Sequence, residues 1–469
     1  MSIQVSELVE DQQEFKGALN IRSKVAVDSP RFVSQVVGLY PEIATEKNAN
    51  EFVSELRQLA SDRLSTLSFP STKDEEWKYT DVSVLGSLAF VNQKESIDRN
   101  SSVEALIAQN TAPESLGNCL VFVNGAYRKD LSDTSGATDG LVIGTLATLG
   151  DRILPKLRSH LAQHPDANDY FASLNTACMG DVAIILAPKN LVVEHPIQIL
   201  FIALPQKTEA SDATLITQPR CLVIAESHSN LTFLQTFVGA DNHLYFTNAV
   251  TEVWLAEGAQ VNHTKVQWQG DQAVHLNTTA IAQARNSVYK NQSISLGAKI
   301  SRQNLVVQQM AEQTETSLTG LAFIDGDQLA DTHSCIAHNY PHGSSKQLHK
   351  CIADGRSHSV FNGKIQVAKL AQNTDSAQLS RNLLLSGKAR VDTKPQLEIF
   401  ADNVKCAHGA TVSQLDADEI FYLQSRAIDA ESAANLLTYA FATEAIAQIP
   451  IVSVQRSLSN FVLEKTRSS

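Results

Sequence analysis

The spacing of apolar residues divides the chain into three stretches. In the first stretch, apolar residues recur every three or four positions within residues 50–64, as they do on one face of an α-helix. These residues are Phe52, Val53, Leu56, Leu59 and Leu64. A second helical pattern covers residues 146–177, and a short strand pattern that ends in a turn, Leu120–Gly125, lies between the two. We therefore predict an N-terminal domain of mixed, mainly helical structure over residues 1–175.

From Gly180 the pattern changes to short apolar runs of strand length, separated by turns rich in Gly, Asn and Asp. Asn373, Gly387 and Asn403 lie in successive turns, 14 and 16 positions apart. Many short strands without intervening helices are typical of a sandwich, a propeller or a solenoid. The sequence lacks the repeat of about 40 residues that propeller blades show, and its irregular short turns favour a solenoid. We predict a β-helical core over residues 176–415.

Helical signals return after the last strand pattern and predict a C-terminal helical domain over residues 416–469. Asp416 opens an acidic first turn, Asp429 is a candidate N-cap residue for the next helix, and a third helix is expected over residues 452–465. The uncovered end of a β-helix exposes unpaired backbone groups that invite aggregation. We expect the helices at the two ends of the chain to cover the two ends of the solenoid.

Composition restricts the partners and the location of the protein. Apolar residues make up 43% of the 469 residues, and the net charge of −12 argues against nucleic acid or an anionic membrane as the main partner. The stretch Met1–Asp11 has neither the basic nor the apolar region of a secretory signal, and no apolar run approaches the ~20 residues of a spanning helix. We expect a soluble cytoplasmic protein whose six cysteines are reduced thiols.

A charged segment, residues 73–80, carries the aromatic residues Trp77 and Tyr79. One interpretation is that Trp77 anchors the helical part of the chain onto the rest of the molecule through its large apolar ring. The other is that Trp77 is exposed and forms a hot spot for a protein partner. The general behaviour of buried aromatic residues favours the anchor.

The segment His333–His358 is rich in residues that bind metals. They are His333, Cys335, His338, His342, His349 and Cys351. Imidazole and thiolate are the usual protein ligands of zinc and iron, so a metal-storing or metal-delivering protein is one hypothesis. Successive side chains of a strand point to opposite faces, however, so these candidates need not converge. The favoured prediction is that the histidines face solvent on successive turns of the solenoid.

A second candidate site is the pair Cys406 and His408, near the end of the strand-rich stretch. Residues i and i+2 of a strand share a face, so the two side chains can meet a partner or a metal together. Cys–His pairs also form nucleophiles, and Cys406 could equally be a buried structural thiol. The sequence contains no G-x-S-x-G, P-loop, Rossmann glycine run or H-E-x-x-H motif, so catalysis by a standard module is unsupported.

An enzyme that cleaves polysaccharides is the alternative class that a β-helix suggests. Such hydrolases need paired carboxylates in a cleft. The acidic residues of this chain form no persuasive cluster across turns, and an aromatic content of 6% is thin for a sugar-binding platform. We keep this class as the less favoured alternative.

Three runs of the strand-rich stretch match a known family. They are 360–365 (VFNGKI), 371–386 (AQNTDSAQLSRNLLLS) and 392–412 (DTKPQLEIFADNVKCAHGATV). Further matches upstream are 76–80 (EWKYT), 171–177 (FASLNTA), 194–198 (EHPIQ), 219–220 (PR) and 257–260 (EGAQ). Together they closely resemble the SufB/SufD family, the scaffold subunits of the Suf iron–sulfur cluster assembly system. The resemblance is specific because many separate stretches match in order over roughly residues 70–460.

Within that family the chain resembles SufD rather than SufB. The run 405–411 (KCAHGAT) is similar to SufD, whereas SufB sequences carry a Glu-His-Glu run there and a further cysteine before an earlier strand. Here the corresponding run, 381–385 (RNLLL), has no cysteine, and the first cysteine of the chain is Cys119. A SufB-like paralogue or a homodimeric scaffold is the alternative.

The resemblance implies a right-handed parallel β-helix between helical N- and C-terminal domains, in a non-catalytic scaffold subunit. It implies pairing with SufB through the β-helices and binding of the SufC ATPase, which carries the ATPase activity. A transient iron–sulfur cluster would form at the SufB–SufD interface, with His408 as a candidate ligand and Cys406 beside it. This chain alone would bind no cofactor tightly, and whether it forms a homodimer is left open.

The resemblance also places the ATPase-docking region in the C-terminal helices. Its candidate residues are Asp416, Phe421, Tyr422, Arg426, Leu436 and Tyr439. Nucleotide-driven pairing of the ATPase could then strain the interface and expose the cluster site.

Overall fold

The structure, a computed structural model, describes residues 27–40, 47–92, 101–205 and 213–467. The stretch Met1–Asp11, on which the prediction about a secretory signal depends, lies outside these residues. The N-terminal helices are α1 (Ser29–Val37), α2 (Lys47–Thr66), α3 (Ser101–Asn110), α4 (Leu146–Leu149), α5 (Leu154–His160) and α6 (Tyr170–Ala177). Short 3-10 helices are η1 (Glu75–Trp77), η2 (Ser83–Ser87), η3 (Pro113–Ser115) and η4 (Gly150–Ile153). The two predicted helical patterns are present, although Leu59 of α2 is 62% exposed rather than buried.

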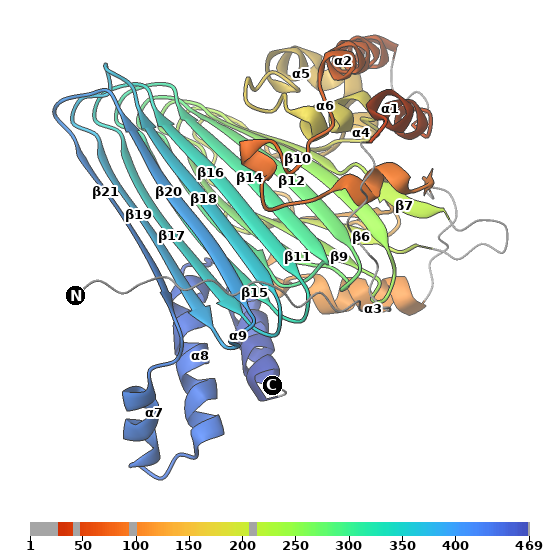
Figure 1. Cartoon of the computed structure of the whole chain (residues 1–469). Helices are drawn as coiled ribbons and strands as arrows, with labels where there is room; N and C mark the ends of the chain where they lie inside the picture. The colour runs from red at the N-terminus through yellow and green to blue at the C-terminus, as the bar shows by residue number, and fades with distance from the viewer. Residues whose placement is uncertain (1–26, 41–46, 93–100, 206–212, 468–469) are drawn as a thin grey trace.

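Two long sheets, here called sheet I and sheet II, make up the body of the molecule (Figure 1). Sheet I contains β1 (Phe90–Val91), β4 (Val142–Thr145), β5 (Ala183–Ala187), β7 (Thr214–Thr217), β8 (Arg220–Ala225), β10 (Tyr245–Leu255), β12 (Val274–Gln283), β14 (Ile300–Gln309), β16 (Leu329–His338), β18 (His358–Val367) and β20 (Arg390–Ile399). Sheet II contains β2 (Cys119–Val123), β3 (Ala126–Tyr127), β6 (Ile197–Ala203), β9 (Asn230–Gly239), β11 (Gln260–Trp268), β13 (Val288–Ser295), β15 (Glu315–Ile324), β17 (Ser344–Ala353), β19 (Asp375–Leu384) and β21 (Lys405–Ser413).

From β8 to β21 the strands alternate between the two sheets, and each pairs in parallel with the strand two places along the chain. These fourteen strands make about seven turns of a β-helix, so the predicted mainly β solenoid with flanking helices is confirmed. One turn takes about 30 residues, because Ser344 pairs in register with Asp375, and Asp375 pairs with Lys405. The spacings of 14 and 16 residues seen in the sequence are therefore the two halves of one turn.

One corner of the β-helix explains the recurring Asn, Gly and His residues. Where the chain leaves a strand of sheet I for sheet II, seven described residues have a positive φ. They are Asn190, His228, Gly258, Asn286, Gln313, His342 and Asn373. The backbone N–H of each donates to a carbonyl of the following turn, as Gly258 does to Arg285. Glycine adopts this left-handed conformation at least cost, and Asn tolerates it better than most residues.

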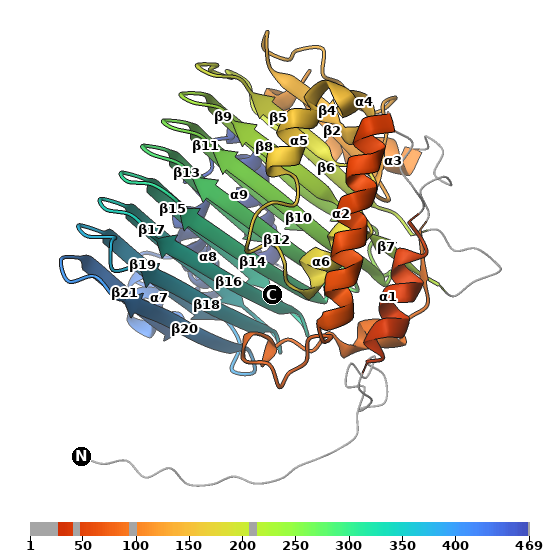
Figure 2. The ribbon, with the colours of Figure 1, turned by 90° about the horizontal axis from the view of Figure 1, so that it is seen from above.

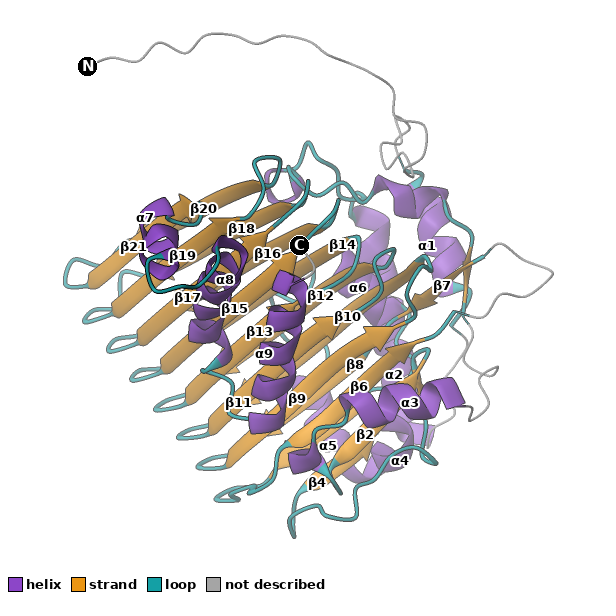
Figure 3. Cartoon of the chain, turned by 90° about the horizontal axis from the view of Figure 1, so that it is seen from below, coloured by secondary structure: helices purple, strands orange, loops and turns teal. Residues whose placement is uncertain are grey.

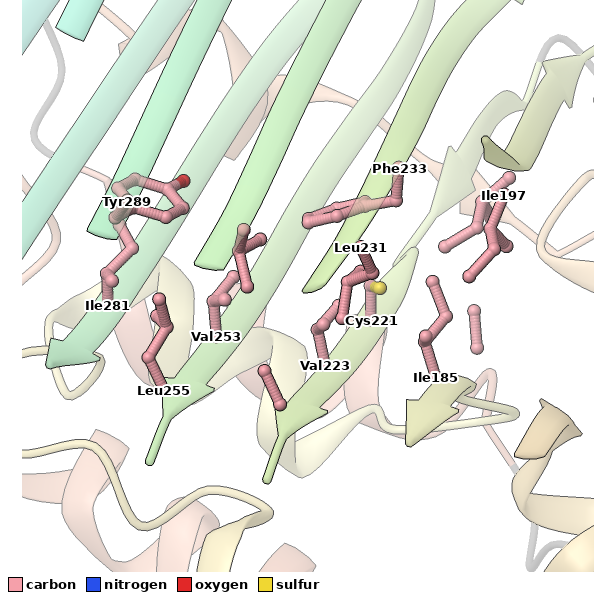
Figure 4. Packing of buried hydrophobic residues seen from close by; sticks show 14 of the residues in the cluster. Ile185, Ile197, Cys221, Val223, Leu231, Phe233, Val253, Leu255, Ile281 and Tyr289 are labelled. Atoms are coloured by element: carbon pink, nitrogen blue, oxygen red, sulfur yellow. The ribbon is translucent and has the colours of Figure 1, made fainter. Parts of the chain in front are cut away.

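An apolar core fills the space between the sheets in the first turns (Figure 4). Val223 and Val253 reach inward from sheet I, and Leu231 and Phe233 reach inward from sheet II. All four are buried, and they contact one another across the solenoid as one cluster. Burial of large apolar side chains on this scale is the main source of stability in a folded domain.

Of the N-terminal helices, α1, α2 and α4–α6 lie on the outer face of sheet I (Figure 2), whereas α3 packs against sheet II (Figure 3). Phe32 of α1 and Phe171 of α6 belong to one buried cluster with Phe246 and Leu276, which point outward from the sheet. The first end of the solenoid is closed by strands of the same N-terminal part, since β4 pairs antiparallel with β5, and β2 pairs parallel with β6.

A buried ion pair also joins the N-terminal part to sheet I. The Arg220 guanidinium on β8 lies 2.6 Å from the Glu252 carboxylate on β10. Glu252 accepts a hydrogen bond from the backbone N–H of Ala162 (2.9 Å), and Arg220 donates to the side chains of Asn175 (3.1 Å) and Thr176 (2.8 Å). Each charge is therefore compensated by its partner and by the segment that covers the sheet.

The C-terminal helices are α7 (Ala417–Gln424), α8 (Ala430–Ile446) and α9 (Val452–Arg467). Asp416 and Asp429 cap α7 and α8, as the sequence predicts, because their carboxylates accept from the N–H groups of Asp418 and Ser432. Helices α8 and α9 pack on the outer face of sheet II (Figure 3). Apolar residues of sheet II that point outward, among them Leu321, form the buried cluster with them.

None of the described helices covers the second end of the solenoid, here called the open end, contrary to the prediction that the terminal helices cover both ends. The terminal strands β20 and β21 each pair with a sheet neighbour on one side, and neither contains a buried residue. By contrast, all ten residues of β12 are buried. The C-terminal helices lie along a face rather than over this end because the apolar stripe that attracts them runs along sheet II.

Residues 73–80 run across the outer face of sheet I, where their side chains contact β14, β16, β18 and β20. The Trp77 ring lies beneath the Arg302 guanidinium (4.0 Å to the ring centroid) and against Phe171, so Trp77 is an anchor between the N-terminal part and the solenoid. Glu75 of the same segment pairs with Lys394 on the terminal strand β20 (2.5 Å). None of the described helices has the length and apolar character needed to cross a membrane.

Candidate functional site

Cys406 and His408 lie on β21, the terminal strand of sheet II. In its pairing with β19, Ser376 stands beside Cys406 and Gln378 stands beside His408. The side chains of Ser376 and Gln378 are buried inside the solenoid, whereas Asp375 is exposed, so alternate residues of β19 point inward. Neighbouring residues of paired strands share a face. Cys406 and His408 therefore lie on the interior face of the last turn, at the open end.

The Cys406 thiol is half-buried at the apolar side of this end. It packs against a small cluster that includes Ile365, Val367 and Ala401. Burial, and then the negative charge of Asp375, raises the pKa of the Cys406 thiol. The thiol therefore keeps its proton at neutral pH and is a poor nucleophile. A metal ion that binds this sulfur has to displace the proton, as metals do with other thiol ligands.

The His408 side chain is exposed, so its ring is accessible from outside the open end. In the part of the chain that the structure describes, no group of three or more His, Cys, Asp or Glu side chains is placed to hold a metal ion. An iron–sulfur cluster usually takes four ligands from protein. Cys406 and His408 offer one sulfur and one nitrogen donor, and the described residues place no third ligand of these types beside them.

The histidine-rich segment contradicts the prediction of solvent-facing histidines in part. His342 is exposed at a corner of the β-helix, whereas His333, His338 and His349 are buried. His338 and His349 lie inside the solenoid with 0% and 3% of their surface exposed. Burial lowers the pKa of both to about 4, so they are neutral at physiological pH. The His349 ring stacks on Phe361 with centroids 4.5 Å apart. The strand pattern shows which residues share a face, but it does not show that this face is covered.

His333 is also covered, on the opposite side of sheet I. Its ring lies between Asp331 and Glu76, each 2.9 Å from a ring nitrogen. Burial by itself lowers the pKa of His333, but the two carboxylates outweigh it and the pKa is raised. His333 thus holds residues 73–80 against the sheet, while His338 points inward to Ser345 (2.9 Å). The described residues of this segment do not converge, and the metal-store hypothesis gains no support.

The candidate docking residues of the C-terminal helices fall into two groups. Phe421, Tyr422 and Leu436 are large exposed apolar residues, and Arg426 donates a hydrogen bond to the Tyr422 hydroxyl (3.1 Å). These side chains are accessible to a partner. The other two have structural positions: Asp416 caps α7, and Tyr439 is half-buried against the apolar cluster between α8, α9 and sheet II.

Sequence reasoning missed Ser376 and Gln378, the two buried residues beside the Cys–His pair. Each is 30 positions before its partner on β21. The only signal available was the length of one turn, which stacks residues about 30 apart. That length is not visible before the strands are paired.

Two family models match the chain. The model of the SUF system FeS cluster assembly SufBD core domain matches residues 207–441, which is half of the chain, and the model of the SufBD protein N-terminal region matches residues 34–199. The chain belongs to the SufBD family. The core match includes the β-helix from β8 to β21 and most of α8, so it contains both Cys406 and His408.

Three relatives place the chain with SufD-type members of this family. An iron–sulfur cluster assembly SufBD family protein of Synechocystis sp. is 41% identical over 419 residues, which cover 87% of this chain and 90% of that protein. The iron–sulfur cluster assembly protein SufD of Escherichia coli is 32% identical over 384 residues (81% and 86%). Protein ABCI7, chloroplastic, of Arabidopsis thaliana is 30% identical over 454 residues (95% and 93%).

Proposed function

We propose that this chain is a non-catalytic, cytoplasmic scaffold subunit of a Suf-type complex, in which its open end joins a SufB-type partner. The observation that carries the proposal is that the Cys–His pair lies at the end of the β-helix that the described helices leave uncovered. Membership of the SufBD family supports iron–sulfur cluster assembly as the process.

The free edges of β20 and β21 support a protein as the occupant of this end. Exposed strand edges offer unpaired N–H and C=O groups, and native proteins usually cover or pair them. Phe400, just after β20, and Val412 of β21 add exposed apolar surface beside these edges. A second β-helix that adds its terminal strands would satisfy the backbone groups and bury this surface.

The cluster is the cargo of this site rather than a resident cofactor. His408 would supply an imidazole nitrogen, Cys406 would be an accessory thiolate, and the partner's side chains would complete the ligand set. Mixed histidine and cysteine ligation of iron–sulfur clusters is chemically ordinary. A site that is complete only when two chains meet also explains why the described residues of one chain hold no metal-binding group of three.

An ATPase subunit is the second partner that we propose, with α7 and the exposed side of α8 as its docking surface. Helix α7 carries Phe421 and Tyr422 yet has no buried residue, which favours a protein that covers it. Glu444 of α8 pairs with both Lys350 on β17 and Arg381 on β19. A displacement of α8 would therefore act on β19, the strand that pairs with β21.

The substitution His408→Ala tests the function at the site itself. We expect the complex with the SufB-type and ATPase partners to assemble in normal proportions, while its iron and sulfide content falls to background after anaerobic purification. The matched control is His195→Ala, because His195 is also exposed but lies before β6, far along the solenoid from β21. A wild-type yield of cluster from His408→Ala would refute the assignment of the site.

A further inference from the structure

Two buried hydrogen-bond ladders run through the interior of the last turns and end beside the Cys–His pair. In the first, His338 Nε2 contacts Ser345 Oγ (2.9 Å), and Ser345 Oγ contacts Ser376 Oγ (2.7 Å). Ser376 is the residue paired with Cys406. The first step crosses the interior from β16 of sheet I to β17 of sheet II, and the second passes from β17 to its neighbour β19, one turn closer to the open end.

The second ladder consists of side-chain amides. Gln347 Nε2 on β17 donates to Ser334 Oγ on β16 (2.8 Å), and Gln378 Nε2 on β19 donates to Gln347 Oε1 (2.8 Å). The next position in this column is His408, because Gln378 pairs with His408 in the register of β19 and β21. Stacked amides of this kind, each donating to the preceding strand, are common where strands pair in register.

The amide of Gln378 is held in one orientation. Only 2% of the residue is exposed, and a Cβ on Gly363 would lie 2.3 Å from its Nε2, so the glycine leaves the space that the amide occupies. Because Nε2 points back to Gln347, the amide oxygen points away from β17. That oxygen is buried and has no hydrogen-bond partner among the described residues. A buried acceptor without a donor is costly, and such exceptions call for a reason.

We propose that Gln378 is the positioning residue of His408. Its amide oxygen accepts the proton of one imidazole nitrogen, which leaves the lone pair of the other nitrogen directed out of the open end. The contact requires the exposed His408 ring to turn toward this oxygen from its place beside Gln378 in the strand register. The inference rests on the proposed function for the identity of the cargo, but not for the contact between the two residues.

The chemistry of histidine ligands explains why this contact matters. A neutral imidazole has one N–H and one lone pair, and the hydrogen bond made by one nitrogen decides which nitrogen can bind a metal. Metal-binding histidines commonly donate their second N–H to an oxygen of the protein, and loss of that oxygen typically reduces metal affinity or activity by about 10- to 100-fold. Gln378 would give His408 this oxygen before any cluster arrives.

Nitrogen NMR of the full-length chain by itself tests the contact. The chain contains 13 histidines, and the His408 signals are identified as those lost in His408→Ala. In the wild-type chain labelled with ¹⁵N-histidine at neutral pH, we expect the two ring nitrogens of His408 to show one dominant tautomer. Gln378→Met keeps the length and burial of the side chain without its oxygen, so the His408 shifts should move to the averaged values of an exchanging imidazole.

Two further variants separate positioning from general damage. Gln378→Glu retains an oxygen acceptor and should keep the wild-type tautomer. Ser376→Ala interrupts the other ladder, beside Cys406, and should leave the His408 signals unchanged. Identical His408 shifts in the wild-type chain and in a folded Gln378→Met would overturn the inference, as would an equal change in Ser376→Ala.

Cluster formation in the assembled complex distinguishes failure of this inference from failure of the proposed function. We expect Gln378→Met to slow cluster formation about ten-fold and Gln378→Glu to recover most of the rate. A changed tautomer together with normal cluster formation in His408→Ala would uphold the contact and refute the function. An unchanged tautomer together with cluster loss in His408→Ala would refute the contact and uphold the function.

Discussion

The first and last turns of the solenoid follow the same backbone plan but end in opposite environments. Every residue of β12 is buried, because an apolar core lies on one side of it and the N-terminal helices lie on the other. No residue of β20 or β21 is buried, and the interior beside them combines a small apolar cluster with buried side-chain amides. The difference shows that the turns gain stability from what covers them, and that the candidate site lies where none of the described helices covers the strands.

Two ion pairs show the same contrast for charged groups. The Arg220 and Glu252 side chains in the first turns are 1% and 0% exposed. The Lys394 and Glu75 side chains, at the open end, are 45% and 65% exposed. Water competes for the charges of the second pair but does not reach those of the first. Removal of one partner should therefore cost much more stability in the buried pair, although the distances within the two pairs are similar.

The largest effect is expected for Glu252→Ala. This change leaves the Arg220 guanidinium buried without its carboxylate and removes the acceptor of the Ala162 N–H. Loss of one partner of a buried pair typically costs about 3–5 kcal/mol, so the midpoint of urea unfolding should fall markedly. A midpoint within experimental error of the wild type would show that the buried Arg220–Glu252 pair contributes no more to stability than the exposed Glu75–Lys394 pair.

An intermediate effect, confined to acid pH, is expected from His349. Its pKa is about 4 in the folded chain, because burial disfavours the charged ring, and about 6.5 when unfolded. The unfolded chain therefore binds the proton more tightly. The contribution to stability is complete above pH ~6.5 and is lost as the pH falls toward ~4, by up to about 1.4 kcal/mol per pH unit.

The substitution His349→Leu should remove this dependence. Between pH ~6.5 and ~4 the free energy of unfolding should then fall less steeply, because about one proton fewer is taken up on unfolding. Urea unfolding at several pH values measures the slope. The matched control is Ile352→Val, which alters a buried residue of the same strand without removing a titratable group and should give the wild-type slope. Equal slopes for the wild type and His349→Leu would contradict the burial argument.

The smallest effect is expected for Glu75→Gln, which breaks the exposed pair with Lys394. The unfolding midpoint should remain within error of the wild type, because exposed ion pairs contribute little. Hydrogen exchange should become faster only in β20, the terminal strand of sheet I, which carries Lys394. Asp327→Asn breaks a similarly exposed pair with Arg356 and should leave exchange in β20 unchanged. Faster exchange throughout sheet I would contradict a local role.

The sequence by itself determined the elements whose signals are local. The helices with Asp416 and Asp429 as caps, the succession of short strands, the solenoid class and the shared face of Cys406 and His408 all depend on residues within a few positions of one another. The family followed from runs of contiguous residues in the same way. Such features can be predicted without knowledge of what packs against them.

Only the tertiary structure decided which surfaces are covered. His338 and His349 are buried, the C-terminal helices lie along sheet II rather than over its end, and Glu252 is compensated by a segment about 90 residues away. Gln378 stands beside His408 because one turn takes 30 residues. A strand pattern defines faces, but the groups that cover a face come from distant parts of the chain, and they determine burial, charge state and the position of the open end.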